Sequence, residues 1–308
     1  MRNLISLGDI TPTTLQGLVT RAVRIAANPD VDRVLTGRAV GIYFSKASTR
    51  TRTSFWRAAT RLGADVITSG FDDLQLTTGE LLSDTARVLS LYLDALVVRT
   101  NGPVEHTRVL GSRDDLAVVN ALSADEHPTQ AVADLAALEE RFGDLSGLNL
   151  LYVGEGNSSA SALLLAAAHL PDLRLTVLCP PGYGIPKAVV DVADELSAGR
   201  STTTHLDAVE DLTGKFDAVY TSRWQQMGVP KADPRWLDAF RGFQVDRALL
   251  DRVGESHTVL LHDLPAVRGQ EVTDEVLDGP RSLAWRQAYH KMTSAMSVLE
   301  WCVLDRRP

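Results

Sequence analysis

Short runs of apolar and β-branched residues alternate with longer helix-like segments along almost the whole 308-residue chain. Several runs are apolar at nearly every position, as strands must be when helices cover both faces of their sheet. This alternation is typical of α/β folds with parallel sheets. Strands are expected at residues 39–44, 64–68, 95–99, 116–120, 148–153, 173–178, 218–221 and 258–261. Helices are expected at residues 12–27, 51–62, 81–91, 129–142, 159–170, 186–196 and 282–304.

The chain is longer than one ordinary domain, and the turn-rich segment 143–147 precedes a fresh strand. The last helical segment is long enough to pack back on the first half. We therefore predict two doubly wound domains with parallel sheets. They comprise residues 1–140 and 141–285, and residues 286–308 form a C-terminal helix that returns to the first domain. The mixed composition of residues 225–241 predicts a functional loop.

Composition narrows the classes of function. The chain has 31 Lys and Arg against 39 Asp and Glu, a net charge of −8, which argues against a general binder of nucleic acid or anionic membranes. A few focused cations can still hold a small anion. Cys179 and Cys302 are too few for a disulfide framework or a four-ligand zinc site. Without an apolar run long enough for a signal peptide or a membrane span, we expect a cytoplasmic protein.

The segment 48–52, with the sequence STRTR, follows the expected strand 39–44 and begins a helix. Free N–H groups at a helix start attract phosphate, and the hydroxyl groups add further donors. The planar guanidinium of Arg50 can bind two phosphate oxygens. The alternative is an ordinary helix cap followed by a solvated basic turn. The combination favours a phosphate site.

Two other strand ends also carry polar side chains. Arg99 ends the expected strand 95–99, and His127 and Gln130 follow the expected strand 116–120. Open α/β sheets bind ligands beyond the carboxyl ends of their strands. A lone histidine is more often structural than catalytic, but three such strand ends together favour chemistry.

Two weaker motifs lie in the second half. The turn with Gly154 and Gly156 starts like a dinucleotide-binding fingerprint, but Ser159 stands where the third glycine is needed, so a packing turn is the more usual interpretation. Asp263 follows the expected strand 258–261. It could bind a cation or orient a base, and an ordinary turn aspartate is the alternative.

Together the motifs resemble the aspartate/ornithine carbamoyltransferase family, and more closely its ornithine branch. The resemblance covers nearly the whole chain and rests on the order and spacing of the motifs. They are STRTR at 48–52, Gln75, DTARVL at 84–89, Arg99, HPTQ at 127–130, Met227-Gly228, His262 with Leu264-Pro265, and RGQEVTDEV at 268–276.

The resemblance implies a homotrimer with active sites between subunits. It also implies transfer of the carbamoyl group of carbamoyl phosphate to an amine, without a metal or cofactor. By family role, the residues that hold carbamoyl phosphate are Ser48, Thr49, Arg50, Thr51, Gln75, Arg99, His127 and Gln130. Gln75 would come from the neighbouring subunit. Arg99 would bridge the phosphate and the carbonyl oxygen, His127 would donate to that oxygen, and Gln130 would hold the carbamoyl amide.

The half of the chain that would hold the amine departs from the ornithine branch. Ser158 follows Asn157 where the ornithine enzymes carry a second Asn. Those enzymes also have an Asp before a Trp-x-Ser-Met-Gly run. Here the Asp position is Ser222, or Arg223 if the alignment slips by one residue, and the Ser position is Gln226.

Two further positions differ. The Cys of the family's His-Cys-Leu-Pro run is Asp263 here, and a C-terminal Arg is Lys291. We expect Asp263 to hold an ammonium group or to position the attacking amine, which adds it to the catalytic set with Arg99, His127 and Gln130. The expected amine-binding residues are Asn157, Ser158, Ser222, Arg223, Gln226, Met227, Asp263, Leu264 and Lys291.

A polar site rejects an analogue that leaves its groups unpaired. The departures therefore predict a transferase of one-carbon groups whose acceptor is neither ornithine nor aspartate, for example a modified or shorter diamino acid in a specialised-metabolite pathway. Aspartate is disfavoured because segment 77–80 lacks the Lys that the aspartate enzymes use. Two alternatives stay open. One is an ornithine carbamoyltransferase of arginine biosynthesis with an unusual site, and the other is a non-catalytic carbamoyl-phosphate-binding paralogue.

Overall fold

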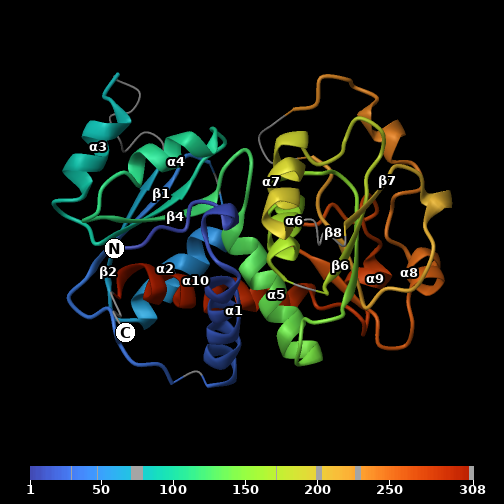
Figure 1. Cartoon of the computed structure of the whole chain (residues 1–308), viewed down its shortest axis with the longest axis horizontal. Coiled ribbons are helices and arrows are strands. Elements are labelled where there is room, and N and C mark those ends of the chain that lie inside the picture. Colours follow the sequence, from blue (N-terminus) through green and yellow to red (C-terminus); the bar gives the residue numbers. More distant parts are fainter. Residues whose placement is uncertain are drawn as a thin grey trace. The chain divides into compact units, whose positions relative to one another are not determined.

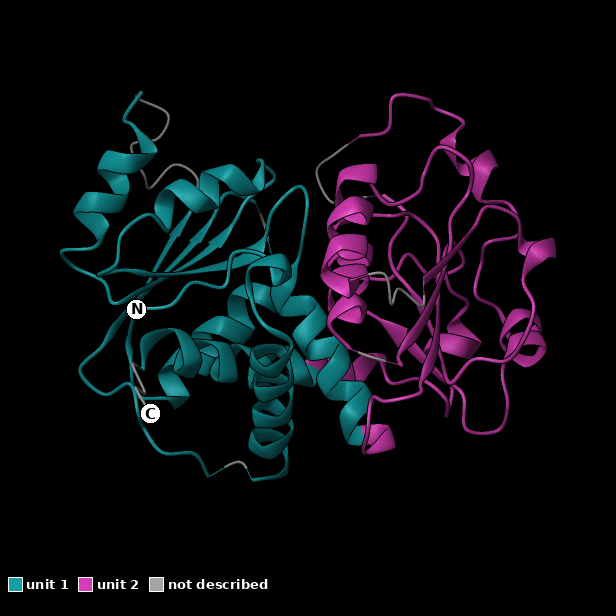
Figure 2. Ribbon diagram, viewed as in Figure 1, with its two compact units in different colours: residues 1–140, 289–308 teal, residues 141–288 magenta. Residues whose placement is uncertain are grey.

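The computed structural model describes residues 1–28, 30–46, 48–70, 79–170, 172–198, 203–225 and 230–304. The chain forms two compact units, which Figure 2 colours separately. Unit 1 comprises Met1–Glu140 together with Tyr289–Pro308, and unit 2 comprises Arg141–Ala288.

Unit 1 is built on a parallel sheet with the strand order β2-β1-β3-β4. Its strands are β1 (Ala39–Phe44), β2 (Asp65–Gly70), β3 (Ala95–Arg99) and β4 (Ala117–Leu122). Phe44 pairs with Arg99, and Arg99 pairs with Leu122, so the last residues of three neighbouring strands lie side by side. The carboxyl edge of this sheet is therefore where the following turns converge.

Helices cover both faces of this sheet (Figure 1). They are α1 (Pro12–Ala27), α2 (Arg50–Arg61), α3 (Leu82–Leu89), α4 (Val104–Leu110), α5 (Pro128–Phe142) and α10 (Ala284–Val303). Residues of α3 and α4, such as Ala86 and Leu110, pack with Leu96 and Val118 of the strands. Figure 1 shows α1, α2 and α10 on the opposite face. Both faces of β1, β3 and β4 are thus buried, as their largely apolar sequences require, whereas the edge strand β2 is exposed or half-buried.

Helix α10 packs against α1 within unit 1. The Ser297 hydroxyl donates to the Leu18 carbonyl at 2.8 Å, and Arg21 forms an ion pair with Glu300 at 2.7 Å. The predicted return of the C-terminal helix to the first domain is therefore confirmed.

Unit 2 carries a second parallel sheet with the order β7-β6-β5-β8-β9. Its strands are β5 (Asn149–Val153), β6 (Arg174–Leu178), β7 (Thr203–Leu206), β8 (Ala218–Thr221) and β9 (Val259–His262). Its helices are α6 (Ser158–His169), α7 (Lys187–Ser197), α8 (Arg247–Val253) and α9 (Asp274–Leu277). Leu250 and Val276 of the short helices pack with strand residues in an apolar cluster that includes Trp224 and Phe240.

The prediction of two α/β domains with parallel sheets is confirmed, but it lacks one strand and three α-helices of the described residues. Strand β7 and helices α4, α8 and α9 were not predicted. The predicted loop 225–241 is wrong in part, because Trp236–Phe240 forms a 3-10 helix whose Phe240 packs into the apolar cluster. Residues 226–229 of that loop lie outside the described residues.

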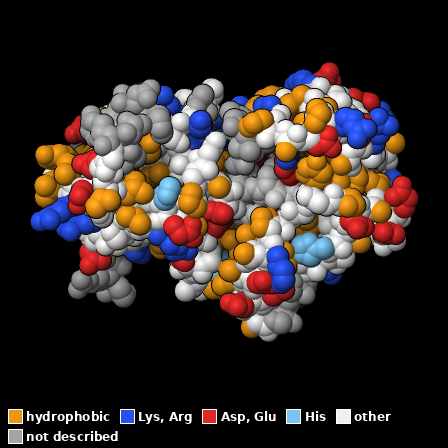
Figure 3. Space-filling model, turned by 90° about the horizontal axis from the view of Figure 1, so that it is seen from above, with side chains coloured by type: hydrophobic (Ala, Val, Ile, Leu, Met, Phe, Trp, Pro, Cys, Tyr) orange, Lys and Arg blue, Asp and Glu red, His pale blue; other side chains and the backbone are white. Residues whose placement is uncertain are grey.

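No helix among the described residues is long and apolar enough to span a membrane. On the face drawn in Figure 3, basic and acidic side chains of the described residues are interspersed.

Candidate active site

The turn between β1 and α2 leads directly into the first turn of a helix. Thr49 is the cap residue, has helical backbone angles, and makes no side-chain hydrogen bond to the first turn. The first N–H groups of a helix have no partner within the helix, and the helix dipole adds positive potential there. Arg50 begins the same helix, so the turn combines backbone donors with a guanidinium group. This is a suitable place for an anion.

Arg99 lies beside this turn, at the end of β3. Its Nη1 donates to the hydroxyl of Thr51 at 3.1 Å, and its backbone carbonyl accepts the Ser45 N–H at 3.0 Å. Thr51 is 3% exposed. The register of β1 and β3 thus brings a second guanidinium to the first turn of α2, as the positions of the motifs predicted.

His127 follows β4, the next strand of the sheet, and is 3% exposed. Its Nδ1 lies 3.4 Å from the hydroxyl of Thr129. Burial, reinforced by the positive charges of Lys291 and Arg99, holds the pKa of His127 well below its ordinary value of 6.5. The imidazole is therefore neutral at physiological pH, and a neutral imidazole still carries one N–H donor.

Gln130 lies in the first turn of α5 and is 1% exposed. Its Nε2 donates to Asp134 at 2.7 Å, and its Oε1 accepts a hydrogen bond from Lys291 of α10. Lys291, expected from the sequence among the amine-binding residues, therefore contacts Gln130 inside unit 1. Asp134 was not predicted, although its spacing of four residues from Gln130 places both on one helix face.

Glu126, directly before His127, is a buried carboxyl group that the sequence reasoning missed. It accepts the N–H of Leu7 at 2.8 Å. Burial raises the pKa of Glu126 from 4.5 to about 7, although hydrogen bonds from Ser6 and Leu7 oppose this rise. The folded protein therefore keeps this proton up to about pH 7, whereas the unfolded chain loses it near its ordinary value of 4.5.

This difference predicts the effect of Glu126→Gln on stability. Between pH 4.5 and about 7 the folded state binds more protons, so the wild type loses stability as pH rises through that window. Glutamine cannot ionise and can still accept the Leu7 N–H. The difference in free energy of unfolding between the variant and the wild type should therefore move by about 2–3 kcal/mol in favour of the variant between pH 4.5 and pH 8. Urea unfolding at both pH values measures this gain, with exposed Glu105→Gln as control. If the variant and the wild type differed in unfolding free energy by the same amount at both pH values, the raised pKa of Glu126 would be contradicted.

In unit 2, Asn157 organises the turn after β5. Its Oδ1 accepts the N–H groups of Ser159 and Ala160 at 3.0 and 3.1 Å and so caps α6. Its Nδ2 donates to the Ser222 hydroxyl at 2.5 Å. A Cβ at Gly156 would lie 2.2 Å from the backbone nitrogen of Ile185, so this glycine allows close backbone packing. The structure thus gives the glycine turn a packing role.

Ser222 follows β8 and is 1% exposed. Besides Asn157, its hydroxyl has the Tyr152 hydroxyl as a neighbour at 3.1 Å. Arg223 is half-buried, and its Nε has no hydrogen-bond partner among the described residues. The hydroxyl of Ser222 is therefore already engaged, whereas Arg223 keeps a donor for a further group.

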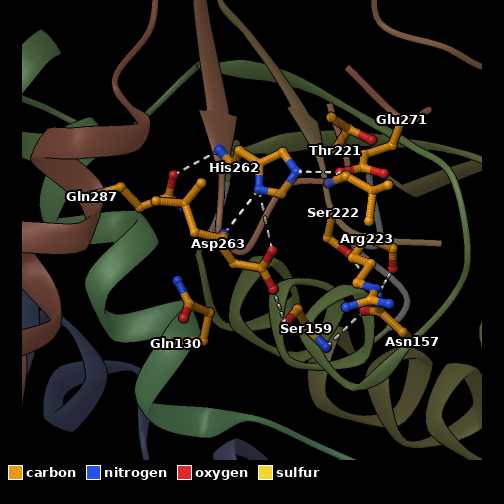
Figure 4. Close-up of polar contacts among 12 residues, drawn as sticks. Gln130, Asn157, Ser159, Thr221, Ser222, Arg223, His262, Asp263, Glu271 and Gln287 are labelled. Atoms are coloured by element: carbon orange, nitrogen blue, oxygen red, sulfur yellow. Dashed lines mark hydrogen bonds and ion pairs between the residues drawn. The ribbon is translucent and has the colours of Figure 1, made fainter. Parts of the chain in front are cut away.

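Asp263 follows β9, and its side chain is 17% exposed. Its Oδ2 accepts the hydroxyl of Ser159 at 2.7 Å, and Oδ1 lies 3.6 Å from Nδ1 of His262 (Figure 4). Ser159 was not predicted as a partner, since nothing in the local sequence signals a contact across 104 residues. The hydrogen bond fixes the direction of the Asp263 carboxylate.

His262 holds the turn that carries Asp263. Its Nδ1 accepts the N–H of Leu264 at 2.8 Å, so Nε2 is the ring donor, and Nε2 lies 3.2 Å from Oε1 of Glu271. His262 and Glu271 are fully buried. Leu264 has φ +53°, a conformation unfavourable for a bulky residue, and these buried contacts maintain it.

Two further predicted residues lie at the starts of helices α2 and α6. Ser48 precedes the cap of α2, and Ser158 begins α6 and is 6% exposed. Gln75, Gln226 and Met227 lie outside the described residues. No group of three or more His, Cys, Asp or Glu side chains in the described part of the chain could hold a metal ion.

Comparison with known proteins agrees with this architecture. Residues 2–140 match the aspartate/ornithine carbamoyltransferase carbamoyl-P binding domain, and residues 146–302 match the Asp/Orn binding domain of the same family. The ornithine carbamoyltransferase of Acidothermus cellulolyticus is 40% identical over 98% of this chain and 96% of its own. That of Caldicellulosiruptor saccharolyticus is 36% identical over 99% of this chain and its own full length.

Solved structures give the same result. The ornithine carbamoyltransferase from Pyrococcus furiosus superimposes with a TM-score of 0.91 at 32% identity, covering 100% of this chain and 98% of that chain. The ornithine carbamoyltransferase from Gloeobacter violaceus does so with a TM-score of 0.85 at 35% identity, covering 97% of each chain. The chain belongs to the aspartate/ornithine carbamoyltransferase family and is a carbamoyltransferase.

Proposed function

We propose that unit 1 binds carbamoyl phosphate and that unit 2 recognises an amino-acid acceptor, whose amino group receives the carbamoyl group. The amine attacks the carbonyl carbon, the bond from that carbon to the phosphate oxygen breaks, and the amine loses a proton. The products are a ureido compound and phosphate. The observation that carries this proposal is the convergence of Thr51, Arg99 and buried His127 on one sheet edge.

Each group of unit 1 has a distinct part in this reaction. The start of α2, with Ser48, Thr49, Arg50 and Thr51, holds the phosphate. Arg99 contacts both the phosphate and the carbonyl oxygen. His127 donates to that oxygen, where negative charge grows during attack, so it stabilises the transition state more than the ground state. We also propose the family's homotrimer, with active sites between subunits.

Ornithine is the first acceptor to consider. The similar proteins named above are all ornithine carbamoyltransferases, and they match this chain over nearly its full length. This likeness favours ornithine over the unusual acceptor expected from the sequence. We therefore propose ornithine carbamoyl transfer as the leading function.

One observation favours a second candidate, a modified or shorter diamino acid. Ser222, which with Arg223 is one of the two candidates for the position of the family's Asp, has a hydroxyl that Asn157 and Tyr152 already engage. Asp263 instead supplies a carboxylate in a direction set by Ser159. The family's Asp follows the strand that corresponds to β8, whereas Asp263 follows β9. A carboxylate at the end of β9 would hold an ammonium group at a different place along the acceptor.

A panel of amines separates these candidates. The purified enzyme receives carbamoyl phosphate with ornithine, 2,4-diaminobutyrate, 2,3-diaminopropionate or aspartate, while phosphate release is followed and the ureido product is identified by mass. A kcat/KM above about 10⁴ M⁻¹s⁻¹ with ornithine supports the leading function. Turnover of a shorter diamino acid with ornithine at least 100-fold slower supports the second candidate. Carbamoyl-phosphate binding with no release for any amine would contradict both.

The variant Asp263→Asn tests the role of this carboxylate with whichever acceptor is turned over. Asparagine can still accept the Ser159 hydroxyl but carries no charge. Loss of a charged hydrogen bond should raise the acceptor KM by about 10- to 100-fold and leave the carbamoyl-phosphate KM within about twofold. Asp238→Asn, at an exposed ion pair with Arg241, is the matched control. Weakened carbamoyl phosphate with an unchanged acceptor KM would refute the assignment.

A further inference from the structure

The amide of Gln130 lies between a carboxylate, which accepts a hydrogen bond from it, and an ammonium group, which donates one to it. Its Nε2 donates to Oδ1 of Asp134 at 2.7 Å, and its Oε1 accepts from Nζ of Lys291. The three residues are 1%, 0% and 8% exposed, and all belong to unit 1. Asp134 lies one helical turn beyond Gln130, whereas Lys291 is 161 residues away in sequence.

This arrangement permits only one orientation of the amide. A carboxylate can only accept hydrogen bonds, and an ammonium can only donate them. Turning the amide by 180° would place its NH₂ group against the ammonium and its oxygen against the carboxylate. Both hydrogen bonds would be lost in a buried site, where unpaired polar groups are most costly.

We propose that Asp134 and Lys291 are positioning residues that hold Gln130 with its Oε1 directed to accept an N–H of the carbamoyl group. This inference rests on the proposed function, in which Gln130 binds the carbamoyl amide. A carbonyl oxygen has two lone pairs, so Oε1 can accept from Lys291 and from the substrate together. Lys291 therefore acts through Gln130, in place of the direct amine contact expected from the sequence.

The same ammonium acts on His127. The charges that oppose protonation of this ring are Lys291 on α10 and Arg99 on β3, and burial contributes most to its lowered pKa. Removing the charge of Lys291 should raise the pKa of His127. The protonation of this ring, followed by NMR titration, should then move to higher pH. A residue with only a packing role would not shift this titration.

A double-mutant cycle tests whether Lys291 works through Gln130. Wild type, Lys291→Met, Gln130→Ala and the double variant are assayed for phosphate release with varied carbamoyl phosphate. We expect Lys291→Met to lower kcat/KM at least tenfold in the wild-type background and less than about threefold when Gln130 is already alanine. Equal factors in the two backgrounds, or an effect confined to the acceptor KM, would overturn the proposal.

Conservative variants and a control make the result specific. Lys291→Arg keeps a charged donor and should retain activity within about threefold. Asp134→Asn presents either a donor or an acceptor, no longer fixes the amide, and should lose activity at least fivefold. Ser297→Ala removes another buried hydrogen bond of α10 and should lower the melting temperature without changing kcat/KM more than twofold. Inactive Lys291→Arg or fully active Asp134→Asn would contradict positioning.

A stability measurement separates failure of this inference from failure of the proposed function. If the wild type releases no phosphate with any acceptor, the proposed function fails and the same four proteins are compared by melting temperature. The contact predicts that Lys291→Met lowers the melting temperature more in the wild type than in Gln130→Ala. Additive shifts would reject the positioning contact as well.

Discussion

In His127→Ala, kcat should fall about 10²- to 10³-fold while the Kd for carbamoyl phosphate changes less than about threefold. The donor is needed most when negative charge develops on the carbonyl oxygen, so its loss raises the barrier more than it weakens ground-state binding. The ring is 3% exposed, so a water molecule cannot easily take its place as the donor to the carbonyl oxygen.

Steady-state phosphate release gives kcat, and calorimetric titration with carbamoyl phosphate gives Kd. His257→Ala is the control, because His257 has an exposed side chain whose ring contacts Asp217 at 2.8 Å. An unchanged kcat in His127→Ala would remove His127 from the chemistry. Because the pKa of this ring is held well below 6.5, the ring is neutral near neutral pH and donates through one N–H.

In Arg50→Ala, carbamoyl-phosphate binding should weaken at least 100-fold. A guanidinium at the start of a helix can make paired, charge-assisted hydrogen bonds with phosphate, and alanine leaves only the backbone donors. Arg57→Ala, two turns further along the same helix and exposed, removes the same charge away from the helix start and should change binding less than threefold.

Isothermal titration at two salt concentrations checks this prediction. Raising the salt concentration should weaken phosphate binding in the wild type, and the dependence should be smaller in Arg50→Ala because one cation is missing. Near-normal binding by this variant would refute the phosphate assignment at the start of α2.

The fold was predictable where strands are fully buried. Strand β4, for example, is buried at every position and apolar at all but Asn120, so its sequence signal is strong. Strand β7 gives no such signal, because it is an edge strand whose residues are exposed or half-buried. Helices α4 and α8 have seven residues each, and α9 has four, too few for a clear helical period.

The site was predictable where one rule of topology applies. Arg99 and His127 follow neighbouring parallel strands, so the carboxyl-edge rule brings them together. The contacts of Asp263 with Ser159 and of Lys291 with Gln130 span 104 and 161 residues. Such pairs depend on how helices pack, which no local pattern in one sequence encodes.

The return of α10 to unit 1 has a consequence for synthesis of the chain. The ribosome completes the first segment of unit 1 and all of unit 2 before it adds Tyr289–Pro308. A nascent or prematurely terminated chain therefore lacks Lys291, and the amide of Gln130 has only one of its two charged neighbours. With the role proposed for Lys291, the chain becomes competent for carbamoyl transfer only when the final helix docks on a domain whose synthesis began about 290 residues earlier.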